Sequence, residues 1–228
     1  MMTAPRHVGI IMDGNRRWAK EHDVSILEGH RAGYRALKAL LPAFKRSNIK
    51  YLSVYAFSVE NWSRSMPEVK GLMSLLKWVF KNELHVFMEE DIRIRVIGSR
   101  QNLSNDIRRL IDKAQQETAR NKSGVLAVCF NYGGQQEIAD AARGIVEKGV
   151  KAQDITDKLI AGHLYASDIP PLDLIIRTSG EQRLSNFMLW RAAYAELYFV
   201  DKHWPDFTPA DFEAALAEFA ARQRRYGA

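Results

Sequence analysis

The stretch His7-Val-Gly-Ile-Ile-Met12, followed at once by Asp13-Gly-Asn-Arg-Arg17, decides how the rest of the sequence is interpreted. A short, continuous apolar run that ends in a polar, glycine-containing segment is typical of a strand buried on both faces. The polar segment then lies at the carboxyl end of that strand. In open parallel sheets, ligands bind beyond the carboxyl ends of the strands.

Similar apolar runs recur along the chain and alternate with patterns of helical period. The runs at 51–57, 92–97, 125–130, 172–176 and 197–199 predict strands, and the segments 27–47, 67–90, 106–120, 136–148 and 211–225 predict helices. Strands that alternate with helices imply crossover connections. The sequence therefore predicts a single α/β domain over residues 1–228, with a central, mostly parallel, six-stranded sheet flanked by helices.

Composition limits the classes of protein that remain. The chain has 228 residues, of which 46% are hydrophobic and 26% charged, which excludes a wholly disordered protein. A net charge of +6 favours an anionic partner, either nucleic acid, acidic lipid or a phosphorylated small molecule. The single cysteine, Cys129, excludes an internal disulfide framework and any cysteine-rich metal site.

The positions of the charged residues limit the kind of partner that we expect, and the hydropathy of the chain limits its cellular location. Lysine and arginine are scattered, and only Arg222-Gln-Arg-Arg225 forms a dense basic cluster, so we expect negligible affinity for nucleic acid at moderate salt. No secretory signal and no run of about 20 apolar residues is visible. A cytoplasmic protein is predicted.

The first polar segment has the residue types of a cradle for a diphosphate and Mg²⁺. Asp13 offers a carboxylate to a hard cation, and Gly14 lets the backbone approach a ligand closely. Asn15 would open a helix whose N–H groups face an anion, and Arg16 and Arg17 add positive charge. A capped helix with two solvated arginines is the alternative interpretation.

A second basic segment follows a later strand. Arg177 and Arg183 are six residues apart, with the hydroxyl groups of Thr178, Ser179 and Ser185 between or beside them. Such a set can bind a second phosphate group through charge-assisted hydrogen bonds. A surface loop whose arginines pair with Glu181 explains the same residues.

A third set follows the second strand. Ser58, Asn61 and Arg64 supply a hydroxyl, an amide and a guanidinium, and Asn61 is a candidate for orienting a substrate, whereas Trp62 is better explained by packing. His30 is a candidate contact for a phosphate or for the reacting centre, and equally a capping or core histidine. Signatures of P-loop NTPases, dinucleotide enzymes, nucleophile-elbow hydrolases and zincins are absent from the sequence.

Taken in order, these segments resemble the motifs of the cis-prenyltransferase family, to which undecaprenyl diphosphate synthase belongs. The resemblance runs from about His7 to Tyr226. It is carried by His7-Val-Gly-Ile-Ile-Met-Asp-Gly-Asn-Arg-Arg-Trp-Ala19, Gly29-His-Arg-Ala-Gly33, Tyr55-Ala-Phe-Ser-Val-Glu-Asn-Trp-Ser-Arg64, Asn131-Tyr-Gly-Gly134, Ile176-Arg-Thr-Ser-Gly-Glu-Gln-Arg-Leu-Ser-Asn-Phe187 and Tyr194-Ala-Glu-Leu-Tyr-Phe199.

The resemblance implies a homodimeric transferase that joins an allylic diphosphate to a second prenyl diphosphate, with Mg²⁺ as its cofactor and a hydrophobic tunnel walled by the helix 67–90. Loose membrane association through a lipid product is compatible with it. The first diphosphate would be bound by Asp13, through Mg²⁺, and by Gly14, Asn15, Arg16, Arg17, Trp18 and His30. Ser58 and Asn61 would sit at the reacting centre, supported by Trp62 and Arg64. The second diphosphate would be held by Arg177, Arg183 and Ser185, with Glu196 assisting its Mg²⁺.

Two departures from the family pattern leave the reaction type open. The family usually has Pro-Arg where this chain has Ser25-Ile26, and it often has Arg where this chain has Gln135. The segment Val24-Ser25-Ile26 is similar to that of lavandulyl-type members, which join two allylic units head-to-middle. Regular elongation with isopentenyl diphosphate is the first hypothesis and this irregular coupling the second. A noncatalytic subunit is the third hypothesis. It is placed last because such subunits usually lose the Asp13 or arginine-rich motifs, and this chain retains them.

Overall fold

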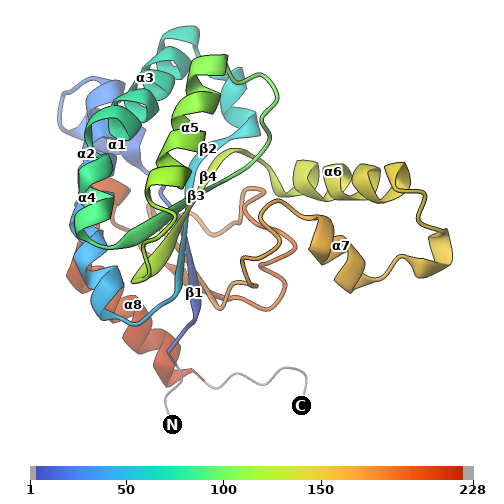
Figure 1. Ribbon diagram of the computed structural model, residues 1–228. Helices are drawn as coiled ribbons and strands as arrows, with labels where there is room; N and C mark the ends of the chain where they lie inside the picture. Colours follow the sequence, from blue (N-terminus) through green and yellow to red (C-terminus); the bar gives the residue numbers. More distant parts are fainter. Residues whose placement is uncertain (1–3, 223–228) are drawn as a thin grey trace.

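A computed structural model describes residues 4–222, and six parallel strands form its centre (Figure 1). Their order is β3-β4-β2-β1-β5-β6, with every neighbouring pair parallel. The strands are β1 (His7–Ile11), β2 (Tyr51–Ser58), β3 (Ile92–Ile97), β4 (Gly124–Tyr132), β5 (Leu174–Arg177) and β6 (Glu196–Phe199). The predicted α/β class and six-stranded sheet are confirmed. The chain leaves β1 toward β2 on one side and adds β5 on the other, so the strand order reverses at β1, where such sheets form a binding crevice.

The helices connect the strands and cover the sheet. They are α1 (Asn15–Glu21), α2 (Ile26–Arg46), α3 (Met66–Asn82), α4 (Leu84–Glu89), α5 (Asn105–Glu117), α6 (Gly134–Glu147), α7 (Asp157–His163) and α8 (Pro209–Ala221). In Figure 1, α6 and α7 extend to the side opposite α2, α3 and α4. Within residues 4–222, no helix combines the length and apolar character that a bilayer crossing requires.

Side chains alternate between two hydrophobic clusters on the two faces of the sheet. Val8 and Ile10 of β1 belong to the larger cluster, which also takes residues from α2, α3, α4, α5 and α8. Ile11 belongs to the smaller cluster, together with Phe187 and Met188. Because β1 is buried on both faces, it is fixed in register, and the loop that follows it is carried on a rigid support.

The helix predicted over 67–90 is two helices, and this prediction is wrong in its continuity. The break falls at Glu83, whose φ of −110° is not helical and whose N–H closes α3 on the Val79 carbonyl at 2.9 Å. The Glu83 carboxylate instead accepts hydrogen bonds from Lys38 at 2.7 Å and Tyr34 at 3.1 Å. No proline or glycine lies at this break, and the apolar pattern of the sequence runs through it. The sequence therefore predicted one continuous helix.

Other boundaries differ by a few residues. The predicted strand 172–176 begins at Leu174, because Leu172 donates its N–H to the Arg191 carbonyl instead of to a neighbouring strand. Helix α7 was not predicted; Thr156 caps it by accepting from the Leu159 N–H at 3.2 Å. In the predicted basic cluster 222–225, only Arg222 lies within the described residues.

The first residue of β1 is a fully buried histidine. The Nδ1 of His7 lies 2.8 Å from the Pro170 carbonyl, which can only accept, so Nδ1 carries the proton and Nε2 accepts from Ser53 Oγ at 2.7 Å. Burial lowers the pKa of His7 from 6.5 to about 4, against the raising effect of the Pro170 hydrogen bond.

This histidine should make stability depend on pH. In the unfolded chain His7 takes up a proton near pH 6.5, whereas in the folded chain it does so only near pH 4. The contribution of His7 to stability is therefore complete above pH 6.5 and is lost as the pH falls from 6.5 to 4. The loss from this group should be about 3 kcal/mol. Chemical denaturation of wild type and His7→Asn at pH 7, 5.5 and 4 measures it. A wild-type slope no steeper than that of His7→Asn contradicts the prediction.

Candidate active site

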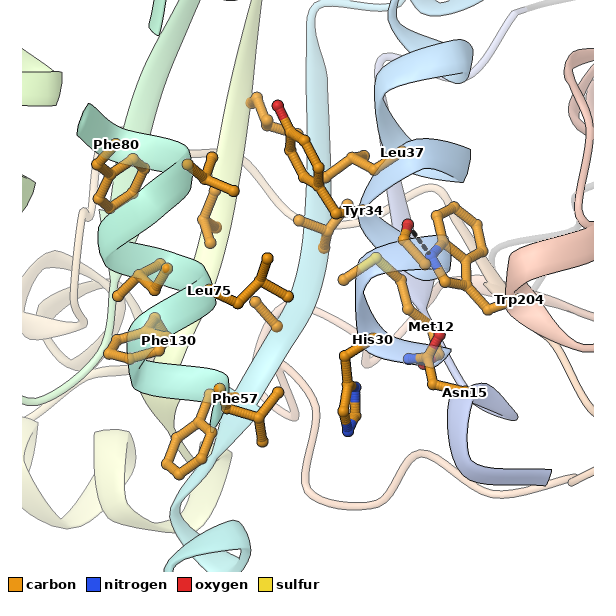
Figure 2. Close-up of a pocket in the computed structure, with 18 of the residues that line it drawn as sticks. Met12, Asn15, His30, Tyr34, Leu37, Phe57, Leu75, Phe80, Phe130 and Trp204 are labelled. Atoms are coloured by element: carbon orange, nitrogen blue, oxygen red, sulfur yellow. Dashed lines mark hydrogen bonds between the residues drawn. The ribbon is translucent and has the colours of Figure 1, made fainter. Parts of the chain in front are cut away.

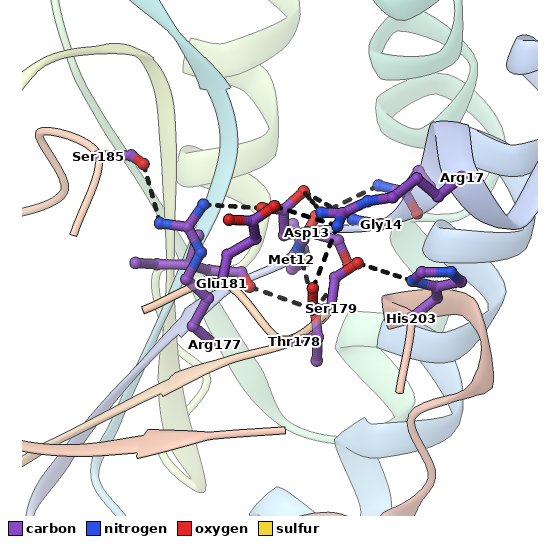
Figure 3. Close-up of polar contacts among 12 residues, drawn as sticks. Met12, Asp13, Gly14, Arg17, Arg177, Thr178, Ser179, Glu181, Ser185 and His203 are labelled. Atoms are coloured by element: carbon purple, nitrogen blue, oxygen red, sulfur yellow. Dashed lines mark hydrogen bonds and ion pairs between the residues drawn. The ribbon is translucent and has the colours of Figure 1, made fainter. Parts of the chain in front are cut away.

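The loop between β1 and α1 is fixed by backbone and hydroxyl contacts within the protein (Figure 3). The Asp13 N–H donates to Thr178 Oγ1 at 3.0 Å, and the Thr178 hydroxyl donates to the Asp13 carbonyl at 2.7 Å. Gly14 has a φ of +105°, and a Cβ there would lie 2.7 Å from His203 Nδ1 and 2.8 Å from Ser179 Oγ. Glycine is therefore required here both by conformation and by space.

An ion pair joins the two predicted phosphate segments. Arg177 donates from Nη2 to Asp13 Oδ2 at 2.7 Å and from Nη1 to Ser185 Oγ at 2.8 Å and to the Arg183 carbonyl. The Arg177 side chain is only 3% exposed, so its charge depends on these partners. Burial raises the pKa of Asp13, but Arg177, Arg17 and the Gly14 N–H together lower it below its usual value. Asp13 is ionised at neutral pH.

Arg17 and Arg183 are less constrained. Arg17 lies 3.3 Å from Asp13 Oδ1 and 3.1 Å from Glu181 Oε1, and Arg183 pairs with the same Glu181 carboxylate. Their side chains are 44% and 59% exposed, so these ion pairs are weak and can be exchanged for contacts with an arriving anion.

A buried carboxylate that was not predicted organises three further site residues. Glu68, on α3, is 5% exposed and accepts from Arg64 Nη1 at 2.8 Å. Its Oε1 also lies 3.6 Å from His30 Nε2 and 3.9 Å from Arg16 Nε. Burial lowers the pKa of His30, and Arg64 lowers it further, although Glu68 opposes both effects. His30 is therefore neutral at pH 7. The spacing of Arg64 and Glu68, four residues apart, was the available signal for this pair.

A second missed residue is His203, which follows β6. Its Nδ1 lies 2.7 Å from Ser179 Oγ and its Nε2 3.0 Å from Glu21 Oε1. It thus connects the last residue of α1 to the loop after β5. The contact spans 182 residues from Glu21 to His203, and no local sequence pattern indicates it.

Ser58 and Asn61 are brought to the same end of the sheet. They bond to one another, since the Ser58 N–H donates to Asn61 Oδ1 at 3.1 Å and the Ser58 side chain accepts from the Asn61 backbone. Trp62 donates its indole N–H to Asn131 Oδ1 at 2.7 Å and packs edge-on against Phe57, which supports the packing interpretation.

These side chains line two polar pockets that meet at shared residues. The first, of about 670 Å³, includes Asp13, Gly14, Asn15, Arg16, Arg17, Ile26, His30 and Arg64. The second, of about 500 Å³, includes Asp13, Ser58, Asn61, Arg64, Arg177 and Ser185. Met12, Asp13 and Arg64 line both pockets, so ligands bound in the two pockets would be neighbours.

An apolar cavity adjoins the first pocket (Figure 2). It lies between α2, α3 and the sheet, has a volume of about 130 Å³ and shares Met12, Asn15 and His30 with the polar pocket. Its remaining lining is almost wholly hydrophobic: Leu37, Val54, Ala56, Phe57, Leu72, Leu76, Val79, Phe80, Phe87, Ile94, Leu126, Val128, Phe130 and others. Asn15 Oδ1 and His30 Nε2 are buried without a hydrogen-bond partner among the described residues. A ligand with an anionic head and an apolar tail suits this arrangement.

Four predicted site residues line neither polar pocket: Trp18, Trp62, Arg183 and Glu196. The Trp18 indole donates to Asp206 at 2.8 Å and stacks on His22, which ties α1 to the segment after β6. Glu196 lies at the opposite end of its strand: it is in register with Leu174, whereas Arg177 is in register with Ile11 beside Asp13. Glu196 instead accepts from Arg222 at 3.0 Å. Within one chain, Asp13 and Glu196 do not share a ligand.

The residues of the site fit a metal ion whose ligands come mainly from the phosphates of a substrate. Residues 4–222 contain no cluster of three or more His, Cys, Asp or Glu side chains arranged around a common metal position. Mg²⁺ commonly binds through one or two carboxylates plus substrate phosphates. Asp13, 28% exposed and ionised between the two pockets, has the chemistry for this arrangement.

Two adjoining polar pockets next to an apolar cavity, at the switch point of a parallel sheet, form an arrangement suited to ligands with anionic heads and apolar tails. Comparison with known proteins identifies the class. Residues 11–227 match the family model described as "Putative undecaprenyl diphosphate synthase". The chain is 49% identical to an isoprenyl transferase of Caulobacter vibrioides, covering 97% of this chain and 87% of that protein. It is 46% identical to isoprenyl transferase 2 of Bradyrhizobium diazoefficiens, covering 98% and 90%.

Solved structures agree with this class. A lavandulyl diphosphate synthase from Lavandula x intermedia in complex with dimethylallyl diphosphate matches with a TM-score of 0.94 and 35% identity, over 99% of both chains. A probable undecaprenyl diphosphate synthase from Campylobacter jejuni matches with a TM-score of 0.84 and 29% identity, over 99% of this chain and 100% of that one. The chain belongs to the undecaprenyl diphosphate synthase family and is a prenyl-group transferase of the cis-prenyltransferase type.

Glu68 offers a test of the electrostatic arrangement. In Glu68→Gln, Arg16, Arg64 and His30 lose a common anionic partner and their fixed positions. We expect turnover to fall about tenfold or more, equivalent to ~1.4 kcal/mol. Affinity for inorganic diphosphate should be unchanged or higher, because a negative charge is removed.

Steady-state turnover and diphosphate titration by calorimetry separate the two effects. Glu213→Gln is the matched control, since Glu213 is 59% exposed and pairs with Arg46 away from the pockets. If Glu68→Gln turns over within twofold of wild type, Glu68 does not position the site.

Proposed function

We propose that the chain elongates an allylic diphosphate with isopentenyl diphosphate in cis, head-to-tail fashion. The observation that carries the proposal is the pair of polar pockets that meet at Asp13 and Arg64, with the apolar cavity sharing Asn15 and His30 with the first pocket and not with the second. The allylic diphosphate occupies the first pocket, with its chain in the cavity. Isopentenyl diphosphate occupies the second.

The reaction breaks the carbon–oxygen bond of the allylic ester, forms a carbon–carbon bond to the isopentenyl double bond and releases a proton. Negative charge develops on the leaving diphosphate, and Arg16, Arg17 and the Gly14 loop stand where they stabilise it. Mg²⁺ held by Asp13 would supply further charge to the same group. The apolar cavity excludes water from the carbocation-like carbon.

Proton removal falls to the released diphosphate in this scheme. His30 is neutral and lies at the mouth of the cavity, but its Nε2 faces Glu68, and Asp13 is occupied by two arginines. The diphosphate remains next to the new bond after it leaves carbon, which makes it the nearest free base.

Arg177 and Arg183 have different parts in holding isopentenyl diphosphate. Arg177 is buried and fixes the loop, whereas the exposed Arg183 is available to fold over the second pocket. Ser185 Oγ lines that pocket and accepts from Arg177. The homodimer, the extended tunnel and the role of Glu196 in assisting the Mg²⁺ of the second diphosphate remain predictions of the family resemblance, and the cytoplasmic location remains a prediction from the sequence.

Arg183→Ala should weaken the second substrate and spare the first. Losing one charge-assisted contact costs about 1.5–3 kcal/mol, or roughly 10- to 150-fold in KM for isopentenyl diphosphate. KM for the allylic substrate should change less than twofold. Arg46→Ala, an exposed arginine paired with Glu213, is the control and should change neither. Equal weakening of both substrates contradicts the assignment of two separate pockets.

A second candidate function is irregular, head-to-middle coupling of two allylic diphosphates. The observation in its favour is Ile26, which lies on the first pocket at 40% exposure with Val24 beside it, where the family pattern has a guanidinium. The likeness to the lavandulyl diphosphate synthase points the same way. Without that guanidinium, the allylic head group is free to sit differently and to present its cation to another double bond.

Substrate omission decides between the two reactions. With dimethylallyl diphosphate and geranyl diphosphate but no isopentenyl diphosphate, we expect no product, because elongation lacks its nucleophile. With isopentenyl diphosphate added, linear cis products should appear, identified by NMR after dephosphorylation. A branched product from allylic substrates alone overturns the elongation proposal and supports the irregular one.

A further inference from the structure

A serine in an unfavourable backbone conformation lies behind the loop that follows β1. Ser179, in the segment after β5, has a φ of +78°, in the left-handed region that residues other than glycine rarely adopt. It is only 6% exposed. Strained residues of this kind persist where the surrounding structure holds them, and they gather at functional sites. Glycine would adopt the same conformation without strain, so the feature that serine adds at this position is its hydroxyl group.

The hydroxyl of Ser179 is bonded to His203, the histidine that follows β6 (Figure 3). Ser179 Oγ lies 2.7 Å from His203 Nδ1, and His203 Nε2 lies 3.0 Å from Glu21 Oε1. A carboxylate only accepts hydrogen bonds, so Nε2 carries the proton of the neutral imidazole. Nδ1 then accepts from the Ser179 hydroxyl. Glu21, at the end of α1, therefore sets the direction of the bond between the other two residues.

Both members of this hydrogen bond pack against Gly14. A Cβ on Gly14 would lie 2.7 Å from His203 Nδ1, 2.8 Å from Ser179 Oγ and 3.0 Å from His203 Cα. Gly14 lines the first polar pocket, whereas Ser179 and His203 do not. The bond therefore supports the wall of the pocket from behind, without contact to a ligand bound there.

The same segments also hold a cation and a carbonyl group of the site. The Ser179 carbonyl accepts from Arg17 Nη1 at 3.2 Å, and the Ser179 N–H donates to the Lys202 carbonyl at 2.8 Å. Two residues further on, the Trp204 N–H donates to the Asp13 carbonyl at 2.9 Å. A displacement of Ser179 relative to the segment after β6 would therefore move both the backbone of the first pocket and Arg17.

We propose that His203 is a positioning residue for the first pocket, and that it acts through the Ser179 hydroxyl on the Gly14 backbone and on Arg17. The inference rests on the proposed binding of the allylic diphosphate in that pocket. The positive φ of Ser179 supports it, because the strain is retained at a position where only the hydroxyl distinguishes serine from glycine as a partner for the imidazole. Arg177, which lines the second pocket, is held by Asp13 and Ser185 instead. We therefore expect the effect on the first substrate to be the larger one.

Separate calorimetric titrations of the two substrates, each alone with Mg²⁺, test the role of His203. In His203→Leu, the Ser179 hydroxyl loses its acceptor, and the Kd for geranyl diphosphate should rise about tenfold. The Kd for isopentenyl diphosphate should change less than about twofold. His203→Asn offers an amide oxygen near the position of Nδ1 and should restore the Kd for geranyl diphosphate to within about threefold of wild type.

His163→Leu is the matched control. His163 is also half-buried and hydrogen-bonded, since it lies 2.8 Å from the Leu159 carbonyl, but it is on α7 and lines neither polar pocket. Neither Kd should change in this variant.

Ser179→Gly separates positioning from stability. Glycine relieves the strain at φ +78°, which offsets its greater freedom in the unfolded chain, so the midpoint of chemical denaturation should stay close to that of wild type. The Kd for geranyl diphosphate should nevertheless rise about as much as in His203→Leu. The double variant Ser179→Gly/His203→Leu should bind no more weakly than His203→Leu, because both changes remove the same bond.

Several results would overturn the proposal. One is a Ser179→Gly variant that binds geranyl diphosphate as tightly as wild type, and another is a double variant whose loss is the product of the two single losses. Equal weakening of both substrates by His203→Leu contradicts it as well. Losses of affinity that simply follow the denaturation midpoints make the bond purely structural. If the wild type never incorporates isopentenyl diphosphate, elongation itself fails, and the geranyl diphosphate titrations still decide the role of His203.

Discussion

The ion pair between Asp13 and Arg177 is the contact on which the geometry of the site depends. It joins the loop after β1 to the end of β5; Asp13 lines both polar pockets, and Arg177 lines the second. A guanidinium that is 3% exposed requires a counter-charge, and removing one partner of such a pair costs about 3–5 kcal/mol because the other charge stays buried. Asp13 is therefore structural as well as functional. An Asp13→Asn variant, which retains a hydrogen-bond acceptor, separates the two roles better than Asp13→Ala.

The arginines of the site fall into two groups by their own exposure. Arg177 and Arg64 have side chains that are 3% and 28% exposed, and they are held by Asp13 and Glu68. Arg17 and Arg183 are 44% and 59% exposed and share Glu181, and screened ion pairs of this kind are worth little. The first group preorganises the pockets, and the second can transfer from carboxylate to phosphate. Stabilisation of a leaving diphosphate requires both properties, fixed donors and a low cost of engagement.

The sequence predicted well those features that depend on residues adjacent in the chain. The strand that ends at Met12 and the polar segment that begins at Asp13 are adjacent in the chain, so their relation at the edge of the sheet followed from pattern alone. Contacts between distant segments were not accessible. His203 reaches Ser179 and Glu21 through tertiary structure, and the helix break falls at Glu83, which bonds to Lys38 and Tyr34 and is not a helix-breaking residue type. Glu196 was placed by motif, but the register of β6 puts it at the other end of the strand from Arg177.

The departure at Ile26 is best understood through the charges that remain around it. Four cationic side chains, Arg16, Arg17, Lys20 and Arg64, line the first pocket against the single carboxylate of Asp13, and His30 is neutral there. A diphosphate thus still meets an excess of positive charge without a guanidinium at position 26. The substitution removes a planar, forked donor at the start of α2 and leaves Lys20, a point charge on a flexible stem, on the same pocket. Its main effect is therefore on the position of the head group, and through it on which double bond meets the allylic carbon, more than on whether the substrate binds.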